Sequence, residues 1–493
     1  MIRVLTVGVL LLAAFEVGTP SVRAVDDEAC ARVSAVRLPN ATISRAETVP
    51  ARDALPLHCR VSATLKPSSD SDIKVEVWLP AAGWNQKYLA VGNGAFNGSV
   101  NTNAMAVALA RGYATSSTDT GHSGGSASFA LGHPEKVVDF GWRAVHEMTV
   151  AAKQIVRSYY AAPPRFSYWN GCSAGGRQAM KEAQRFPDDY DGIIAGAPGL
   201  DWTGRAAQAV RVAKFLEANE VARLAAPQRE ALHRAVVFAC DTLDGVKDGL
   251  IENPERCRFD PGALECKADG ERGCLTAPQV ATAKMLYAPL SNTVTGRAIP
   301  GLARGSELGW TDLGWTASAR ATGLDQFRYI VFADAGWDVQ RFEPEDIARA
   351  EKADEGTINA LDANLKPFIA RGGKLLQYHG WSDPQISPGN STQYYRRVAE
   401  TLGGLTRIHG SYRLFMAPGM GHCGGGDGPN TFDAVAALEQ WVEHGTAPDR
   451  IIASHATNGV VDRTRPLCPY PQTAVFDGVG NADQAVSFVC KAF

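Results

Sequence analysis

The chain has 493 residues, 45% of them hydrophobic, so it can bury a large core in one domain with a big insertion, or in two or three domains. Its 49 basic and 52 acidic residues leave a net charge of -3, without a Lys/Arg run that could follow a phosphate backbone or an anionic membrane. This composition excludes a disordered chain and argues against a nucleic-acid partner.

The first 24 residues predict an export signal. Arg3 gives a short basic start, an apolar run follows from 4 to 15, and Val22 and Ala24 occupy the small-residue positions of a cleavage site. Glu16 interrupts the apolar run before it reaches the ~20 residues that a membrane span needs. We expect a secreted or periplasmic protein, cleaved near Ala24, with no membrane span in the mature chain.

Export places the ten cysteines, an even number, in an oxidising compartment where as many as five disulfides can form. Close spacing favours two local pairs, Cys266 with Cys274 and Cys468 with Cys490. The spacing leaves the other pairings open.

Strand and helix patterns alternate in the first part of the chain. Strands are predicted at 73–79, 87–91 and 166–169, a glycine-rich loop at 92–98, and a helix at 139–160 that ends before a Pro-Pro pair. This alternation predicts an α/β fold with a parallel sheet.

The pattern changes between 200 and 360, where short helical runs, four cysteines and clusters of Gly, Asp and Trp replace it. We expect a lid domain over 200–360, inserted into an α/β catalytic domain made of 25–199 and 361–493, after a signal peptide at 1–24. The α/β pattern resumes with a helix at 360–370, strands at 374–378 and 411–417, and a helix at 431–444.

A serine lies between glycines in the motif from Gly171 to Gly175, directly after an apolar strand and directly before a helical run at 177–186. In a G-x-S-x-G elbow, the glycines let strand and helix approach closely and leave the serine hydroxyl exposed at a strained turn. A glycine-rich turn without a catalytic role is the alternative, and the flanking strand and helix favour Ser173 as a nucleophile.

A serine nucleophile needs a histidine base that a carboxylate orients, and in this fold the order along the chain is Ser, acid, His. His422 follows a predicted strand in a glycine-rich loop, and Asp383 follows the strand before it. We therefore predict the triad Ser173, Asp383 and His422.

Other residues compete for these roles. His379 could be the base if Asp383 only forms a turn, and Asp427 could be the acid although it follows the histidine. His409, His444 and His455 are predicted at strand starts or helix ends, where a surface or packing role is favoured.

The cysteines add support, because Cys172 precedes the predicted nucleophile and Cys423 follows the predicted base. If serine and histidine are within hydrogen-bond reach, these two cysteines could lie at the ~4.4 to 6.8 Å Cα separation of a disulfide. Free or differently paired cysteines are the alternative.

Attack on an ester produces an oxyanion that needs two backbone N–H donors. Ala174 supplies one donor at the start of the helix, and the stretch at Gly94 and Ala95 in the early glycine-rich loop is the candidate for the other. That loop could also be a tight turn and nothing more.

An acidic loop in the lid spaces Asp241, Asp244 and Asp248 with main-chain carbonyls between them. Calcium takes six to eight oxygens from such a mixture, and the spacing differs from an EF-hand. We expect a structural calcium site there, with a solvated acidic turn as the alternative.

With these residues in hand, the sequence resembles the tannase and feruloyl esterase family of α/β-hydrolases, in which a cysteine beside the serine is joined to one beside the histidine. Three further segments carry the resemblance, at 118–122, 139–146 and 192–198.

The resemblance implies a lid calcium held by the three aspartate side chains and by the carbonyls of Val246 and Leu250. It implies no organic cofactor. It also implies five disulfides, namely Cys30–Cys59, Cys172–Cys423, Cys240–Cys257, Cys266–Cys274 and Cys468–Cys490.

Family members cleave feruloyl, galloyl or mono(hydroxyethyl) terephthalate esters, so the resemblance implies a small aromatic ester as the substrate, with a feruloyl ester favoured. Four lid aromatics could face the ring or could pack the lid core: Trp310, Trp315, Phe327 and Trp337. Arg320 and Arg328 are candidates for polar contacts to the ring. A catalytically silent secreted binding protein is the remote alternative.

Overall fold

Nine strands form one mixed sheet, and the order in which they lie sets the position of every loop discussed below. The computed structural model describes residues 27–268 and 273–492, so the predicted signal peptide lies outside the described residues. The order across the sheet is β1-β2-β3-β5-β4-β6-β7-β10-β11, antiparallel from β1 to β5 and parallel from β5 to β11. The bounds are β1 Ala41–Val49, β2 His58–Leu65, β3 Ile73–Pro80, β4 Lys87–Val91, β5 Ala114–Thr118, β6 Phe166–Cys172, β7 Gly192–Gly196, β10 Lys374–Gly380 and β11 Tyr412–Ala417. The sheet and its crossover helices have the α/β-hydrolase architecture that the sequence predicts.

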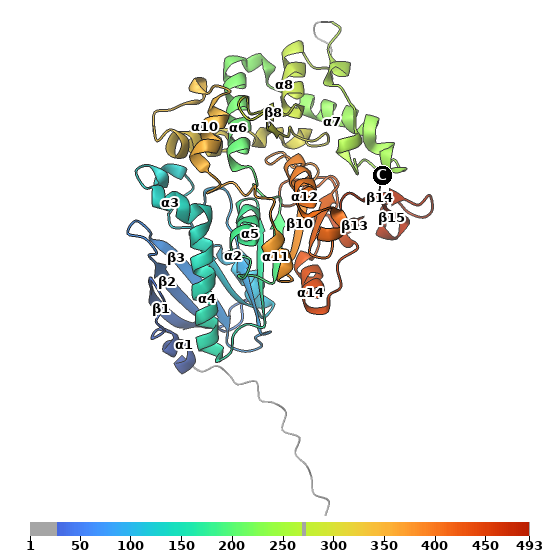
Figure 1. Cartoon of the computed structure of the whole chain (residues 1–493). Helices are drawn as coiled ribbons and strands as arrows, with labels where there is room; N and C mark the ends of the chain where they lie inside the picture. The colour runs from blue at the N-terminus through green and yellow to red at the C-terminus, as the bar shows by residue number, and fades with distance from the viewer. Residues whose placement is uncertain (1–26, 269–272, 493) are drawn as a thin grey trace, which may run out of the picture.

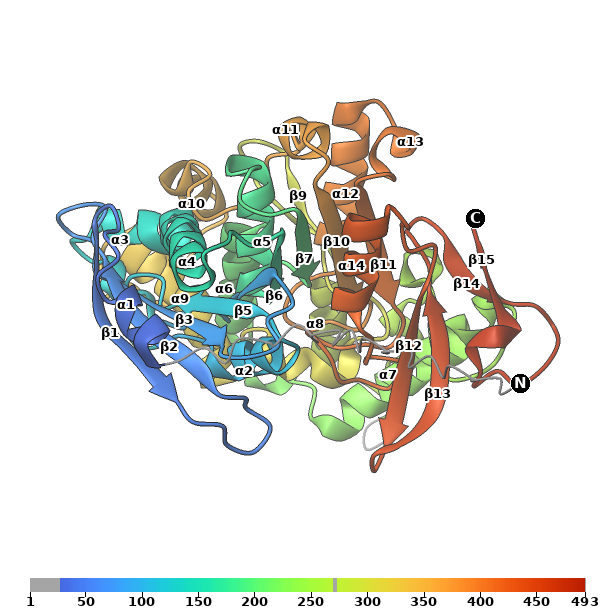
Figure 2. The ribbon, with the colours of Figure 1, turned by 90° about the horizontal axis from the view of Figure 1, so that it is seen from below.

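Helices cover both faces of the sheet. One core cluster joins it to α1 (Asp27–Val33), α4 (Ala144–Tyr160), α5 (Ala174–Arg185) and α12 (Gly389–Leu402). A second joins the other face to α2 (Thr102–Ala110) and α14 (Ala434–His444). Seen from below, β1 lies toward one end of the molecule, and the hairpins β12–β13 (Ile451–Thr457, Val460–Leu467) and β14–β15 (Thr473–Phe476, Phe488–Lys491) lie toward the other (Figure 2).

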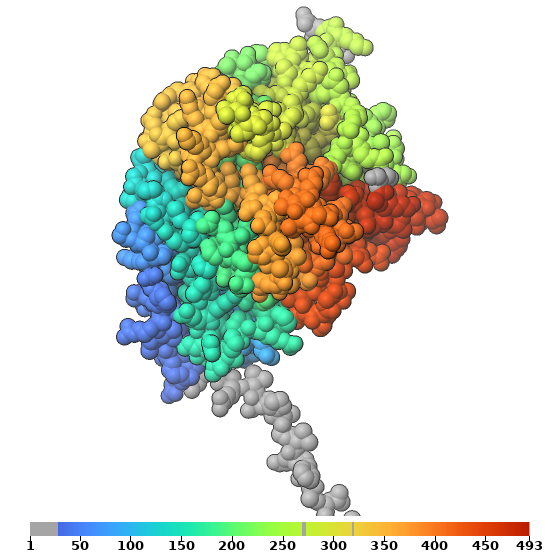
Figure 3. Space-filling model, in the orientation of Figure 1, coloured from blue at the N-terminus to red at the C-terminus, as the bar shows by residue number. Residues whose placement is uncertain are grey.

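The segment between β7 and β10 forms a cap of helices over one end of the sheet (Figures 1 and 3). Its helices are α6 (Trp202–Ala218), α7 (Ala226–Cys240), α8 (Ala277–Tyr287), α9 (Ala317–Asp325) and α10 (Asp346–Asp354), with the short pair β8–β9 (Leu290–Ser291, Ala298–Ile299). Two apolar clusters of its own stabilise this cap. It occupies the place predicted for the lid, and α6 and α7 are longer than the short helical runs that the sequence suggests.

Some predicted bounds change in the structure. The helix predicted at 360–370 is only α11, Lys366–Ala370, because Asp362 and Asn364 accept backbone N–H groups two residues on and Pro367 then starts the helix. The helix predicted at 139–160 begins with a π-helical turn before α4, and α14 begins three residues late, where Asp433 caps it. The remaining short helices are α3 (Pro134–Val138) and α13 (Leu405–Ile408). No helix within the described ranges is both long and apolar enough to cross a bilayer.

Candidate active site

Ser173 forms the turn between β6 and α5 in a backbone conformation that residues other than glycine rarely adopt, with φ 63° and ψ -119°. The turn is too tight for side chains, because a Cβ at Gly171 would lie 2.5 Å from Gly175 O and one at Gly176 would lie 2.3 Å from Gly196 O. Ser173 N donates to Gly196 O at 3.0 Å. The glycines of the motif therefore permit a strained elbow with the serine at its tip.

The predicted acid and base lie on adjacent loops at the same edge of the sheet. Asp383 follows β10, His422 follows β11, and His422 Nδ1 is 2.7 Å from Asp383 Oδ2. Burial by itself raises the pKa of Asp383, but the charge of His422 and the hydrogen bonds from His379 and His422 outweigh it and hold that pKa well below its usual range. The ionised Asp383 accepts the Nδ1–H of His422 and leaves Nε2 available to take a proton.

A disulfide joins the loop that carries the predicted base to the elbow that carries the serine. Cys172 and Cys423 are bonded with a Cα–Cα distance of 6.0 Å. Among the described residues, Ser173 Oγ makes no hydrogen bond of standard geometry to His422. Such contacts are often long in unliganded enzymes and shorten in the substrate complex. The other four disulfides are those that the resemblance implies: Cys30–Cys59, Cys240–Cys257, Cys266–Cys274 and Cys468–Cys490.

His379, the alternative candidate for the base, is buried against the predicted acid and does not line the cavity beside Ser173. Its Nε2 is 3.0 Å from Asp383 Oδ2 and its Nδ1 is 2.7 Å from Ser391 Oγ, while the whole side chain is buried. Ser391 Oγ accepts from Gln377 Nε2 at 2.6 Å, and Gln377 Oε1 accepts from the Tyr412 hydroxyl. If Ser391 Oγ donates to His379 Nδ1, every hydrogen bond in this buried series donates in the direction of Asp383. The four-residue spacing of His379 and Asp383 at the end of a strand was the available sequence signal for this contact.

A cavity of about 270 Å³ opens beside Ser173, between the carboxyl ends of the strands and the lid. Its lining residues come from the loops after β4, β6, β7 and β10, from α6 and from the lid: Ala95, Ser173, Gly199, Trp202, Arg205, Asp312, Thr316, Thr322, Gln385 and Ile386. A cavity at the carboxyl ends of parallel strands is where ligands bind in α/β proteins. Ser173 and Trp202 line it together.

The lid aromatics singled out in the sequence do not line this cavity. Trp310, Phe327 and Trp337 are at most 1% exposed inside the two lid clusters, and Trp315 packs against the first of them. The aromatic residue of the cavity is Trp202, which is not among the residues predicted from the sequence although it follows the Gly-Ala-Pro-Gly turn after β7.

The two lid arginines considered from the sequence are occupied elsewhere. Arg320 pairs with Glu217, and Arg328 Nε donates to Trp337 O at 2.5 Å. Neither lines the cavity.

The loop after β4 lies against the elbow. Gly175 N donates to Asn93 O at 2.8 Å, and the Asn93 side-chain amide donates to Ser99 O and Thr118 O, both at 2.8 Å. Ala95, with φ 44°, lines the cavity, and Ala174 is fully buried at the first position of α5. Both predicted oxyanion donors, Ala174 N–H and the stretch at Gly94, therefore lie in segments that flank Ser173.

The acidic lid loop offers only part of a calcium site. Asp244 Oδ2 is buried without a hydrogen-bond partner, and burial raises the pKa of Asp244 to about 6, so a cation would satisfy this carboxylate. Asp241 accepts from the backbone N–H of Asp248 and Gly249, and Asp248 pairs with Arg465. These three aspartates are not among the described side chains that gather within 4.8 Å as a metal-binding group.

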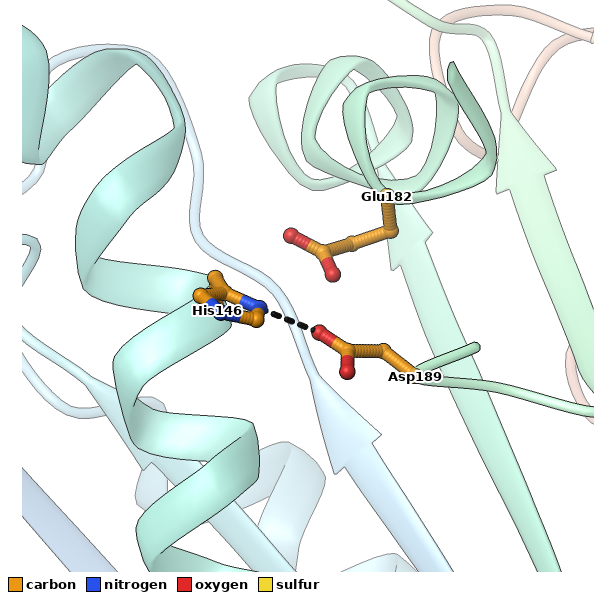
Figure 4. A group of neighbouring side chains, drawn as sticks. All are labelled: His146, Glu182 and Asp189. Atoms are coloured by element: carbon orange, nitrogen blue, oxygen red, sulfur yellow. Dashed lines mark hydrogen bonds and ion pairs between the residues drawn. The ribbon is translucent and has the colours of Figure 1, made fainter. Parts of the chain in front are cut away.

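The described side chains that do gather in this way are His146 of α4, Glu182 of α5 and Asp189 of the following loop (Figure 4). His146 Nδ1 is 2.7 Å from Asp189 Oδ2, and the carboxyl of Glu182 points toward this pair. Burial, with the neighbouring charge of Asp189, raises the pKa of Glu182 well above its usual value. The raised pKa favours a neutral Glu182, which lessens the repulsion between the two carboxyl groups of this cluster.

The other residues considered as acid or base make contacts away from the cavity. Asp427 is exposed and 3.7 Å from His233, and His455 pairs with Asp462 on the β12–β13 hairpin. His409 stacks against Tyr395, and His444 ends α14. None of these residues lines the cavity beside Ser173.

Comparisons with known proteins agree with this geometry. The family model described as tannase and feruloyl esterase matches residues 59–491. An uncharacterised esterase of Xanthomonas campestris is 38% identical, covering 99% of this chain and 96% of its own length. A probable feruloyl esterase B-2 of Neosartorya fischeri is 32% identical over 92% of this chain and 94% of its own.

Solved structures show the same fold. The crystal structure of feruloyl esterase B from Aspergillus oryzae has a TM-score of 0.89 and 31% identity, and it covers 94% of this chain and 100% of its own. Tannin acyl hydrolase from Aspergillus niger has a TM-score of 0.78 with 22% identity, covers 95% of each chain, and shows the fold alone. The chain therefore belongs to the tannase and feruloyl esterase family and is a carboxylic ester hydrolase.

Proposed function

We propose that this enzyme hydrolyses esters of small aromatic acids, feruloyl esters first, through an acyl-enzyme on Ser173. The observation that carries the proposal is the hydrogen bond between His422 and the buried Asp383, on a loop tethered by Cys172–Cys423 to a strained serine at the edge of a cavity. The relatives named feruloyl esterase favour the feruloyl substrate.

Each residue has one task in the proposed reaction. Ser173 Oγ attacks the ester carbonyl carbon while His422 Nε2 takes the hydroxyl proton, and Asp383 stabilises the imidazolium. The N–H groups of Ala174 and of the loop at 94–95 donate to the oxyanion. His422 then protonates the departing alcohol as the ester C–O bond breaks.

Water completes the cycle. His422 takes a proton from water, the oxygen attacks the acyl carbon, and Ser173 leaves with that proton restored. The products are the aromatic acid and the alcohol. Trp202 and Ile386 offer an apolar wall on which an aromatic acyl group can lie.

Two other substrates come from the same family, galloyl esters and mono(hydroxyethyl) terephthalate. The family model, described as tannase and feruloyl esterase, keeps the galloyl ester as the first alternative. Comparing kcat/KM on methyl ferulate, methyl gallate and mono(hydroxyethyl) terephthalate distinguishes them, and the highest value on either of the last two substrates would replace the feruloyl proposal.

A Ser173→Ala variant tests the mechanism. We expect turnover of methyl ferulate to fall on the order of 10⁴-fold or more with an unchanged melting temperature. A fluorophosphonate probe should label the wild type at Ser173 and leave the variant unlabelled. Turnover that survives the substitution would contradict the acyl-enzyme mechanism, and an unlabelled, inactive wild type would indicate a silent binding protein.

We also propose export and a structural calcium ion. The five disulfides suit a secreted or periplasmic location. Asp241, Asp244 and Asp248, with the carbonyls of Val246 and Leu250, would hold the ion, and its charge would neutralise the buried Asp244 carboxylate in the lid.

A further inference from the structure

A histidine and two carboxyl groups gather from three different elements, away from the cavity beside Ser173. His146 comes from α4, Glu182 from α5 and Asp189 from the loop before β7. One nitrogen or oxygen of each lies within 4.8 Å of those of the other two, and none of these residues lines the cavity (Figure 4). We propose that the three side chains bind one Zn²⁺ ion. This site is independent of the proposed ester hydrolysis and of the proposed calcium ion in the lid.

The carboxyl group of Glu182 is the observation that points to a ligand. The side chain is 0% exposed, and neither of its oxygens has a hydrogen-bond partner within the described ranges. The carboxyl group is directed toward His146 and Asp189 (Figure 4). A buried carboxyl group without a donor or a cation is costly, since its desolvation is not compensated. A metal ion inside the cluster would supply the missing positive charge.

No cationic side chain in the described part of the chain already fills this role. The carboxylates that flank the cluster have a cation of their own, because Arg371 pairs with Asp188 and Asp191. The ammonium of Lys153 donates to the backbone oxygen of Asp189, and no ion pair joins it to a carboxylate of the cluster. The two carboxyl groups of the cluster are therefore without a Lys or Arg partner.

The ring of His146 is held with Nδ1 facing the cluster. It stacks on Phe186 with centroids 3.8 Å apart and 12° between the planes, and Nδ1 is 2.7 Å from Asp189 Oδ2. Zinc ligands lie ~2.0–2.2 Å from the metal, so the ligand atoms of a tetrahedral site are ~3.3–3.6 Å apart, and side-chain shifts of about 1 Å would suffice here. The side chains of His146 and Asp189 are 27% and 13% exposed, which leaves an entry path and a position for water.

The ligand types distinguish zinc from calcium. An imidazole nitrogen with two carboxylates suits zinc, whereas calcium takes six to eight oxygen ligands. His146 would bind through Nδ1 in the neutral form that keeps its proton on Nε2. Glu182 lies roughly 13 Å along α5 from Ser173, so the ion would join α4, α5 and the loop before β7 without contact to the nucleophile.

Calorimetric titration with ZnCl₂ tests the site on mature enzyme that has been freed of metals and reloaded with excess CaCl₂. We expect one zinc ion with a Kd in the micromolar range or below. At a zinc concentration 100 times Kd, the melting temperature should rise by about 3 °C. His146→Gln, Glu182→Gln and Asp189→Asn should each weaken zinc binding at least ~10-fold. The enzyme loaded with calcium alone is also the sample for chelation tests of the lid, because it contains no zinc.

Two control variants should bind zinc as the wild type does. His133→Gln is the matched control, since His133 and Asp70 form a similar pair at 2.8 Å on an exposed surface. His422→Gln removes the imidazole of the proposed triad and so excludes zinc binding there as the source of the signal. His146→Gln and Asp189→Asn alter partly exposed side chains, so they keep the test decisive if Glu182→Gln does not fold.

Two results would overturn the zinc site. One is a wild-type enzyme that does not bind zinc, which would leave a proton shared between Glu182 and Asp189 as the compensation for burial. The other is zinc binding that persists in both His146→Gln and Asp189→Asn. Neither result bears on Ser173-dependent turnover of methyl ferulate, which tests the esterase proposal separately.

Discussion

Replacing His379 should slow the proposed reaction without weakening substrate binding, because this side chain contacts Asp383, the proposed acid of the triad, and does not line the cavity. His379 Nε2 donates to Asp383 Oδ2 at 3.0 Å, and both side chains are fully buried. A hydrogen bond to a buried charge contributes ~1.5–3 kcal/mol, which corresponds to about 10- to 150-fold in rate if the loss falls on the transition state. We therefore expect His379→Leu to lower kcat for methyl ferulate by that factor with little change in KM.

The conservative variant distinguishes support of Asp383 from simple packing. His379→Gln retains an N–H donor of similar reach and should recover part of kcat, while His379→Leu should not. The rate of fluorophosphonate labelling at Ser173 should fall in parallel with kcat. His455→Gln, on an exposed hairpin pair, is the control and should leave kcat unchanged.

Three results would refute this reasoning. The first is a kcat for His379→Leu within twofold of the wild type. The second is an identical loss for the Leu and Gln variants. The third is a loss of activity that follows the fraction of unfolded protein in thermal denaturation, since packing alone would explain that.

Three other predictions concern stability. Burial raises the pKa of Asp119 to about 6, whereas an aspartate in an unfolded chain has a pKa of about 3.9. Between pH 4 and 6 the folded protein therefore binds more protons than the unfolded chain. Its free energy of unfolding falls as the pH rises through this range, by at most ~3 kcal/mol for this group. Asp119→Asn should make this fall smaller in urea unfolding, while the amide oxygen still accepts the two backbone hydrogen bonds that Oδ1 accepts. Other buried carboxyls with a raised pKa, Asp244 among them, contribute the rest of the fall. Replacing Cys172 and Cys423 by Ser removes a disulfide between residues 251 positions apart. The free energy of unfolding should fall by up to about 5 kcal/mol, and kcat/KM should fall as well. Chelation with EGTA should lower the melting temperature of the wild type and have little effect on Asp244→Asn.

Matched variants serve as controls for these predictions. Asp72→Asn, at an exposed carboxylate, should keep the fall in stability between pH 4 and 6. Replacing Cys468 and Cys490 by Ser should lower the melting temperature and leave kcat/KM near the wild-type value. A fall in stability between pH 4 and 6 that is unchanged in Asp119→Asn, a Cys172/Cys423 variant with wild-type kcat/KM, or a melting temperature insensitive to EGTA would each contradict the corresponding prediction.

Local chemistry made several features predictable. The glycines around Ser173 permit its strained elbow, and the strands ending before Asp383 and His422 put both at the same edge of a parallel sheet. Strand β5 was missed because its run of Ala, Thr and Ser lacks the apolar alternation of a half-buried strand. It is nevertheless fully buried, and Thr115 and Ser116 are satisfied by hydrogen bonds to Leu89 O and the Tyr88 hydroxyl.

By itself, the sequence determined the nucleophile motif and the alternation of strands and helices, because each depends on residues that are neighbours in the chain. Only the tertiary structure decided which side chains share the cavity. Trp202 and Arg205 meet Ser173 there because β7 lies beside β6 and α6 leaves its end, while the lid aromatics turn into their own core. A helical pattern in the sequence specifies which face of a helix is buried, but not which element that face packs against. The packing of α6 and of the lid helices therefore decided which side chains line the cavity.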